Sequence, residues 1–396
     1  MSKGKVRLAI IGCGRMARGH LKGYMKIKDK EPDKFDFVAM CDPVAEQAQS
    51  FADEAAKAQS SAPRVYTDLD EMLKNEELDG TDICSRHSDH HINGVACLDA
   101  GINVLIEKPF GVTIKASKLL LEAAKRNGKI TATAENVRRG PSQRTAHWMF
   151  NESKIIGEPR FFFSQTASWR GTDPVPWNWR ADHMLSGGGM VLNSGSHFCD
   201  TIRYLFGDVD TVYAQVKRIE DRKANKNDQL VSRDEEDMWA ATITFKSGVI
   251  GVWNITWAAP GHSFNQVIYY GSEGSIRDRD VFHGPRGDTE IKMKDGTVRP
   301  MSELQEEFMA TLGEKEKNRL FPHGFTSGVD IECYDFLDAI QNDRQPEITG
   351  EMGMKANAIS EAIFESGACG KAVKYDDVLS GKIDMYQRPI NEYWGI

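Results

Sequence analysis

The sequence has few of the features that mark secreted or membrane-embedded chains. Its seven cysteines are scattered and form no C-x-x-C pair, a pattern typical of reduced thiols. No apolar run reaches the length of about 18 residues that a membrane-spanning helix needs. The opening "MSKGKVRLAII" lacks an apolar stretch followed by a small-residue cleavage site, so we expect no signal peptide and a cytoplasmic location.

Basic residues are also fewer than acidic residues. Lysine and arginine total 50 against 58 acidic residues, which gives a net charge of −8. Such a chain has no basic field to attract phosphates, so nucleic acid and anionic membranes are not expected as partners. With 396 residues, of which 40% are hydrophobic, the chain can instead bury a large core, and its length favours two domains.

Strand-like and helix-like segments alternate through the first third of the chain. The strand-like runs are "VRLAII", "FDFVAMC", "DGTDICS", "INVLIEKPF" and "KITATAEN", and helical patterns separate them. This alternation predicts a doubly wound parallel sheet with right-handed crossovers. We expect a dinucleotide-binding domain over residues 1–135, followed by a second domain over 136–396.

A glycine motif follows the first strand. Gly12 permits a tight turn, Gly14 lets a pyrophosphate approach the backbone at a helix N-terminus, and Ala17 lets that helix pack closely on the sheet. Arg15 and Met16 lie between these positions and are expected to contact the cofactor. The alternative is a flavodoxin-like fold that binds no cofactor.

The second strand ends in an acidic residue, Asp42. A carboxylate at this place accepts hydrogen bonds from the ribose hydroxyls and repels a 2′-phosphate. Pro43, which follows, offers no donor for a phosphate. The sequence therefore favours NAD over NADP, and Arg15 is the one residue that could weaken this preference.

Further polar residues stand where the later strands end. Ligands of parallel sheets bind beyond the carboxyl ends of the strands, so Glu107 and Lys108 should face the nicotinamide. We place Ser85, His90 and Asn136 on the same cofactor side. The histidines at 87, 90 and 91 have no cysteine or carboxylate set at ligand spacing, and no metal site is expected.

The second domain has a different pattern, with many strand-like runs joined by short turns. It predicts an α+β domain with a large, mostly antiparallel sheet. Within it, "SGGGMVLNSGSHFCDTIRYLFGD" reads as one helix that carries Asn193, His197, Asp200 and Tyr204 on one side. Solvent-facing helices normally use Lys, Glu and Gln, so we expect this side to line an active site. The preceding glycines should admit a ligand and leave backbone N–H groups open to it.

Aromatic and basic residues gather just before that helix. Trp169 and Trp179 stand near Arg180. Indoles stack on the apolar faces of sugar rings, and arginine donates hydrogen bonds to hydroxyl groups or a carboxylate. We expect these residues to bind substrate together with Asn193 and Asp200. Core or interface packing is the open alternative for the tryptophans.

The combined motifs resemble those of the Gfo/Idh/MocA family, the relatives of glucose–fructose oxidoreductase and inositol dehydrogenase. The resemblance rests on the glycine motif at 12–17, on Glu107-Lys108-Pro109 and on the glycines at 187–189 followed by Gly195-x-His197-x-x-Asp200. It spans residues 5 to 375 and implies that Lys108 and His197 are catalytic. It also implies a homo-oligomer, a dimer or tetramer, that forms through an open sheet face. Many members carry Asp where this chain has Asn193, which we include in the catalytic set.

The expected chemistry is hydride transfer between NAD and a secondary alcohol of a sugar, glycoside or cyclitol. His197 would exchange the hydroxyl proton, and the charge of Lys108 would stabilise developing alkoxide character. Two alternatives stay open. One is a redox-neutral enzyme that retains NAD, oxidises C3 transiently and cleaves a glycosidic bond by elimination. The other is a dinucleotide-binding regulator without catalytic activity.

Overall fold

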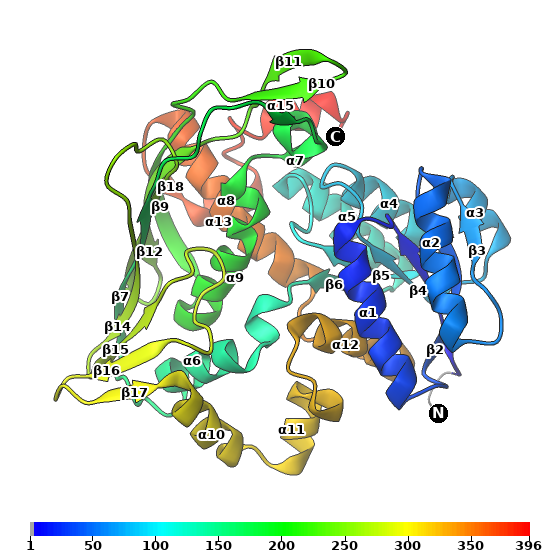
Figure 1. Cartoon of the computed structure of the whole chain (residues 1–396), viewed down its shortest axis with the longest axis horizontal. Helices are drawn as coiled ribbons and strands as arrows, with labels where there is room; N and C mark the ends of the chain where they lie inside the picture. Colours follow the sequence, from blue (N-terminus) through cyan, green and yellow to red (C-terminus); the bar gives the residue numbers. More distant parts are fainter. Residues whose placement is uncertain (1–3) are drawn as a thin grey trace. The chain divides into compact units, whose positions relative to one another are not determined.

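The computed structural model describes residues 4–396 and divides the chain into two compact units (Figure 1). The first contains the residues up to Arg139 together with Lys315–Met354, and the second contains Gly140–Glu314 and Lys355–Ile396. This division differs from a single boundary after residue 135. The segment Lys315–Met354 returns to the first unit, a long-range packing choice that local sequence patterns do not encode.

The first unit is built on a six-stranded parallel sheet with the order β3-β2-β1-β4-β5-β6. The predicted doubly wound sheet is confirmed. Its strands are β1 Val6–Ile11, β2 Phe35–Cys41, β3 Arg64–Tyr66, β4 Gly80–Ile83, β5 Asn103–Glu107 and β6 Thr131–Ala134. The intervening helices are α1 Arg15–Lys30, α2 Ala45–Ala55, α3 Leu69–Asn75, α4 Asp89–Asp99 and α5 Ile114–Asn127.

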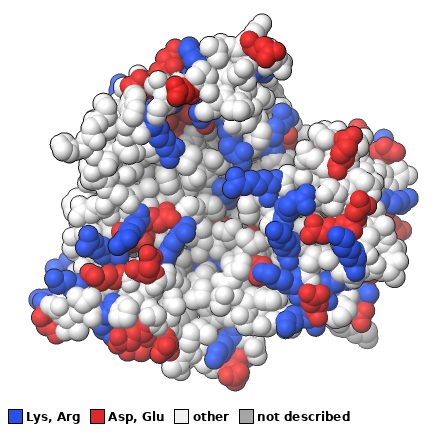
Figure 2. Space-filling view, in the orientation of Figure 1, with Lys and Arg blue, Asp and Glu red and all other residues white. Residues whose placement is uncertain are grey.

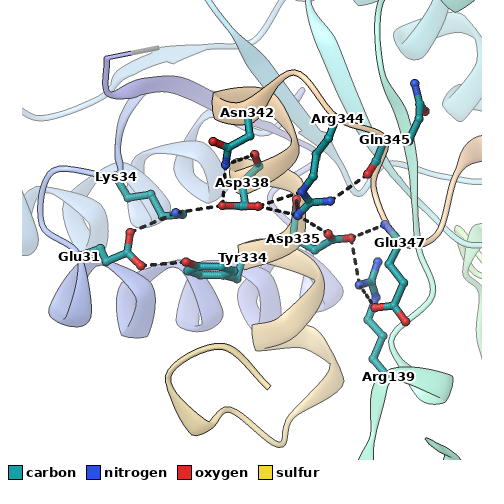
Figure 3. A network of polar contacts seen from close by, with 10 residues as sticks. All are labelled: Glu31, Lys34, Arg139, Tyr334, Asp335, Asp338, Asn342, Arg344, Gln345 and Glu347. Carbon is teal, nitrogen blue, oxygen red and sulfur yellow. Dashed lines mark hydrogen bonds and ion pairs between the residues drawn. The ribbon is translucent and has the colours of Figure 1, made fainter. Parts of the chain in front are cut away.

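Helix α12 (Gly328–Asn342) completes the core of this unit by packing on α1. A methyl group added at Gly23 of α1 would lie 3.3 Å from Oδ1 of Asp330, so the two helices are in close contact there. A polar network joins α12 to Glu31 and Lys34 on one side and to Arg139 and Glu347 on the other (Figure 3). In it, Tyr334 donates to Glu31 at 2.9 Å, and Asp335 accepts from the buried Arg139 at 3.1 Å.

The second unit contains a nine-stranded sheet with the order β17-β16-β15-β14-β7-β13-β12-β9-β18. Its strands are β7 Pro159–Ala167, β9 Val209–Lys217, β12 Met238–Phe245, β13 Ile250–Thr256, β14 Phe264–Gly271, β15 Gly274–Asp278, β16 Glu290–Met293, β17 Val298–Pro300 and β18 Val373–Lys374. Every neighbouring pair is antiparallel except β7 and β13. The predicted antiparallel sheet of an α+β domain is confirmed.

Helices of this unit lie on one side of the large sheet (Figure 1). They are α6 Pro141–Asn151, α7 His183–Ser186, α8 Met190–Asn193, α9 Gly195–Phe206, α10 Met301–Thr311, α14 Tyr375–Ser380, α15 Arg388–Tyr393 and the part of α13 (Gly350–Cys369) that follows Met354. The core between sheet and helices is aromatic: Phe162 stacks on Phe206 with ring centroids 5.5 Å apart. A small sheet of β8 Val175–Pro176, β10 Lys223–Lys226 and β11 Gln229–Ser232 is also present, and α11 spans Glu314–Leu320.

The opposite side of the large sheet carries a row of mostly apolar side chains. Strand register places Tyr213, Thr242, Val252, Phe163 and Ile268 beside one another across five strands. Among the described residues 4–396, no helix covers this side in Figure 1.

Figure 2 shows acidic and basic side chains interspersed on the face in view, with uncharged surface between them. None of the described helices is long and apolar enough to cross a bilayer.

Candidate active site

The glycine motif forms the turn between β1 and α1. Gly12 adopts φ +85°, and a methyl group there would lie 2.7 Å from the backbone nitrogen of Ser85. Gly14 is the N-cap of α1, and apart from its chain neighbours and its own helix none of the described residues has an atom within 4 Å of where its Cβ would be. The open space at a helix N-terminus fits a pyrophosphate, which the first N–H groups of α1 would hold. Arg15 and Met16 lie exposed in that first turn.

Asp42 lies against this turn. Its Oδ2 accepts a hydrogen bond from the Cys13 N–H at 2.7 Å, and its Oδ1 accepts one from the Val44 N–H at 2.8 Å. Each carboxylate oxygen keeps a second lone pair with which it can accept a hydrogen bond from a ribose hydroxyl. The residues present therefore fit a dinucleotide, and the two backbone bonds fix the orientation of the acid.

Glu107, at the end of β5, is held from inside the unit. One of its oxygens accepts from the backbone N–H of Lys108 at 3.0 Å, and the other lies 3.1 Å from Nε2 of His20. The second ring nitrogen of His20 lies 2.8 Å from Asp82 on β4. His20 is completely buried. Glu107 thus anchors the backbone of Lys108 to a buried histidine in α1 rather than facing outward.

The charge state of this cluster follows from its surroundings. Burial lowers the pKa of His20, but the charges and hydrogen bonds of Asp82 and Cys84 together outweigh burial and hold that pKa well above its ordinary value. Glu332 of α12 lies 3.5 Å from the same imidazole, and burial raises the pKa of its carboxyl well above the usual range. The ligand atoms of His20, Glu107 and Glu332 lie close enough together to hold a metal ion. Because His20 contacts Asp82 and Glu107 directly, we interpret the cluster instead as a buried ion pair beside a protonated Glu332.

Sequence analysis did not identify His20, Asp82 or Glu332 as contributors to the site. A signal for His20 was present, because it lies beside Leu21 and Tyr24 on the apolar face of α1. A polar side chain on a buried helix face needs a partner. The partners come from β4, β5 and α12, and these long-range contacts leave no local sequence pattern.

His90 connects two loops that sequence analysis assigned to the cofactor side. Its Nδ1 lies 2.8 Å from the carbonyl oxygen of Pro109, and its Nε2 lies 3.2 Å from that of Ser85. Burial lowers the pKa of His90. The Ser85 hydroxyl accepts from Asn93, and the Asn136 backbone packs against Gly328 at the start of α12. These contacts give His90 a role in holding the loop of Lys108.

In the second unit, the expected single helix is two helices. Helix α8 ends at Asn193, and α9 begins at Gly195 after a break at Ser194. A methyl group at Gly195 would lie 2.6 Å from the Trp253 ring, so packing against the sheet requires this glycine. The interruption was not predicted, because the apolar spacing of the sequence runs through it without a change of phase.

The glycines before α8 are packed against protein atoms, which corrects the expectation that they stay open to a ligand. Gly187 adopts φ +76° and its carbonyl oxygen accepts from the Tyr386 hydroxyl. A methyl group at Gly188 would lie 2.6 Å from Phe364. The N–H groups of Gly189 and Val191 each donate to one oxygen of Glu236 at 2.8 Å. A buried carboxylate therefore occupies the helix start.

The polar side of α9 is buried. His197 is 7% exposed and Asp200 is 2% exposed, so neither belongs to a solvated face. Tyr204 stacks on His147 of α6 with ring centroids 4.1 Å apart. Asn193, at the end of α8, is half-buried. The structure thus keeps His197 and Asp200 on one helix, as expected, and encloses them.

A second histidine lies beside His197, and sequence analysis missed it. The ring of His283, in the loop after β15, has its centroid 5.1 Å from that of His197. Its Nδ1 lies 3.0 Å from both oxygens of Asp280. The spacing Asp280-x-x-His283 was the available signal, but short acid–histidine spacings are common and only the fold brings this pair to α9.

The tryptophan segment lies at the surface of the second unit. Trp169 is 44% exposed, and the Arg180 guanidinium lies over the Trp179 ring at 4.2 Å. Arg170 lies over Trp257 at 4.0 Å, and Lys226 lies over Trp177 at 4.2 Å. Trp179 and Arg180 thus contact each other, and Trp169, which follows the end of β7, forms an isolated bridge with Ala258.

Two models of one protein family match the chain. Residues 6–135 match its NAD-binding Rossmann-fold domain, described as an oxidoreductase family, and residues 149–277 match the Gfo/Idh/MocA C-terminal domain. The two matched ranges together cover more than half of the chain.

Curated relatives match along nearly the whole chain. D-apiose dehydrogenase of Paraburkholderia graminis is 25% identical, and the match covers 92% of this chain and 88% of that protein. Myo-inositol 2-dehydrogenase of Thermotoga maritima is 22% identical over 94% of this chain and all of its own length.

Solved structures share the fold. An oxidoreductase domain protein from Kribbella flavida superimposes with a TM-score of 0.77 at 20% identity, covering 94% of this chain and all of that one. A levoglucosan dehydrogenase in complex with NADH and L-sorbose gives a TM-score of 0.75 at 22% identity, covering 94% of this chain and 99% of that one.

The glycine turn, the acid at the end of β2 and the matching family model identify the first unit as a domain for a nicotinamide cofactor. The second unit has the sheet of the family's C-terminal domain. The chain is an oxidoreductase that belongs to the Gfo/Idh/MocA family.

Proposed function

We propose that this protein is an NAD-dependent dehydrogenase that oxidises a secondary alcohol of a sugar, glycoside or cyclitol. The observation that carries the proposal is the enclosure of His197 on α9 within a domain of this family. A buried imidazole beside polar groups is suited to exchange a proton, whereas an exposed helix face would have no such role. Named relatives support the substrate class, since they act on apiose, levoglucosan and myo-inositol.

The residues of the first unit would hold the cofactor. The N-terminus of α1 would bind the pyrophosphate, and the oriented carboxylate of Asp42 would accept hydrogen bonds from the adenosine ribose. The bound nicotinamide supplies the hydride acceptor. Asp42 supports NAD over NADP, because a second negative charge at the 2′ position would face a fixed carboxylate.

Lys108 and His197 are the proposed catalytic residues. Glu107 fixes the backbone of Lys108 through its N–H, so the loop can hold the ammonium group at a defined place. The cation would stabilise negative charge that develops on the substrate oxygen, and His197 would accept the hydroxyl proton. Asn193 and Asp200 would bind substrate hydroxyls from α8 and α9, with Trp179 and Arg180 at the rim.

The test is turnover with NAD across a panel of aldoses, methyl glycosides, anhydrosugars and inositols. We expect absorbance at 340 nm to rise with at least one of them, and kcat to fall by about 100-fold or more in His197→Ala, as for loss of a general base. NAD titration by protein fluorescence should give an unchanged Kd for that variant. Wild-type kcat in His197→Ala would refute the assignment, and consumption of a glycoside without NADH release would favour the redox-neutral alternative.

A further inference from the structure

The loop that carries His283 is fixed firmly on the helix that carries His197. Gln143 of α6 donates to the carbonyl oxygens of His283 and Pro285, at 2.5 and 2.8 Å. Gly284 adopts φ +70°, and a methyl group there would lie 2.6 Å from Thr201 of α9. A left-handed glycine in close contact with α9 sets the position of the neighbouring imidazole.

Asp280 orients the ring of His283. Its Oδ1 accepts from the backbone N–H groups of Phe282 and His283, at 2.9 and 3.0 Å, and Arg286 lies 2.7 Å from its Oδ2. Burial raises the pKa of Asp280, but the His283 bond and the Phe282 N–H outweigh burial and leave that pKa at about 2. An ionised carboxylate accepts from the Nδ1–H of His283, which leaves Nε2 as the proton acceptor.

The two imidazoles differ in their access to water. His197 is 7% exposed, whereas the side chain of His283 is 31% exposed. Their ring centroids lie 5.1 Å apart with planes tilted by 37°. On α8, Asn193 carries an amide, which cannot accept a proton, whereas the loop carries a histidine paired with a carboxylate.

We propose that His283, oriented by Asp280, relays the proton between His197 and solvent during the oxidation proposed above, on which this inference rests. The substrate carbon gives a hydride, with its electron pair, to the nicotinamide, and the C–O bond becomes a carbonyl. The hydroxyl proton passes to His197, then to Nε2 of His283 directly or through one water, and then to solvent. Each turnover yields one ketone, one reduced cofactor and one released proton.

Other charged groups also face this pair. Asp280 and Arg286 lie on the loop of His283, and His197 approaches from α9. Asp278 of β15 and Tyr269 of β14 lie near Asp280. Burial raises the pKa of Asp278 to about 7, so its titration falls in the same pH range as that of a histidine. Asp278→Asn therefore has to be measured beside the other variants.

The kinetic test uses Asp280→Asn, whose neutral amide removes the negative charge that pairs with the imidazole of His283 when it takes up a proton. We expect kcat to fall by about 10- to 100-fold with little change in KM, as for loss of a carboxylate that orients a histidine. Imidazole added to His283→Ala should restore part of the lost kcat, because the position is open to solvent. His262→Gln, an exposed histidine on another loop, is the matched control and should behave like the wild type.

A second measurement needs no substrate. Interacting imidazoles titrate as a coupled pair, so NMR of histidine-labelled protein should show two linked steps for His197 and His283. In His283→Gln, His197 should titrate in a single step, and Asp278→Asn should leave the coupling intact. Independent titration of His197 in the wild type, or wild-type kcat and pH profile in Asp280→Asn, would overturn the relay. If the wild type shows no turnover but the two histidines still titrate as a coupled pair, the proposed function is refuted and the interaction between the two histidines is not.

Discussion

At the scale of single residues, Asp42 orders the glycine turn, and we expect it to discriminate between the two dinucleotides. Because its carboxylate bonds to Cys13 and Val44, its charge stands at a fixed place beside the turn. We predict that wild-type protein binds NAD more tightly than NADP and that Asp42→Asn narrows this preference by about tenfold. The lost repulsion between charges a few ångströms apart is on the order of 1–4 kcal/mol.

Fluorescence titration with both dinucleotides measures this preference. Asp70→Asn, which neutralises an exposed acid in α3 of the same unit, is the control and should leave both Kd values unchanged. An Asp42→Asn protein with the wild-type ratio of affinities would show that the acid does not discriminate.

Single residues also show how far the sequence can be interpreted. The roles of Gly12 and Asp42 follow from a local motif whose chemistry requires those residue types, and the structure places both at the turn. His283 could not be inferred in this way. Its relation to His197 depends on β15 ending beside α9, and 85 residues of the chain separate the two histidines.

At the scale of elements, the start of α8 depends on Glu236. Its two oxygens accept from the N–H groups of Gly189 and Val191, which would otherwise be buried without partners. We predict that Glu236→Ala lowers the free energy of unfolding by about 1–3 kcal/mol, the usual cost of leaving such groups unsatisfied. Urea denaturation measures the loss, and Glu158→Gln, an exposed acid at the edge of β7, should change little.

The pKa of Glu236 also makes the free energy of unfolding depend on pH. Burial raises the pKa of Glu236 from 4.5 to about 7, although backbone hydrogen bonds from Val191, Glu236 itself and Gly189 oppose the rise. Between those values the folded state binds more protons than the unfolded state, so its contribution to stability falls as pH rises from 4.5 to 7. Glu236→Gln should remove this slope. Parallel stability curves for the two proteins over that range would contradict the prediction.

The elements of the two sheets were predictable because strand-like runs and helical patterns alternate clearly along the chain. The break between α8 and α9 was not, because the apolar spacing of the sequence continues through it; Gly195, beside the break, packs against the Trp253 ring of a distant strand. The glycines at 187–189 were expected to stay open to a ligand, but they pack against protein atoms. Their partners, Glu236, Phe364 and Tyr386, come from elsewhere in the second unit and cannot be recognised from the motif.

At the scale of the whole molecule, the apolar row on the large sheet is a candidate surface for association. Phe163 stands at its centre, between Val252 and Ile268 on the neighbouring strands. Large exposed apolar surfaces mark association sites, and we expect a second copy of the chain to cover this one. Light scattering should give a wild-type mass that is a multiple of 44.3 kDa, whereas Phe163→Asp should give 44.3 kDa.

Leu230→Asp serves as the control, since Leu230 is an exposed apolar residue of β11 outside that row. It should keep the wild-type mass. Circular dichroism would show that Phe163→Asp remains folded. A wild-type protein that runs as a monomer would exclude this surface as a stable interface.

The return of residues Lys315–Met354 to the first unit affects how the protein is made. When the six parallel strands have left the ribosome, α12 has not yet been synthesised. Leu21, Tyr24 and Ile27 of α1 are therefore still exposed. The residues that cover them, among them Cys333, Phe336 and Leu337, are synthesised after almost 200 further amino acids. The nucleotide domain therefore cannot finish folding during its own translation, and the nascent chain must keep one apolar flank protected until α12 emerges.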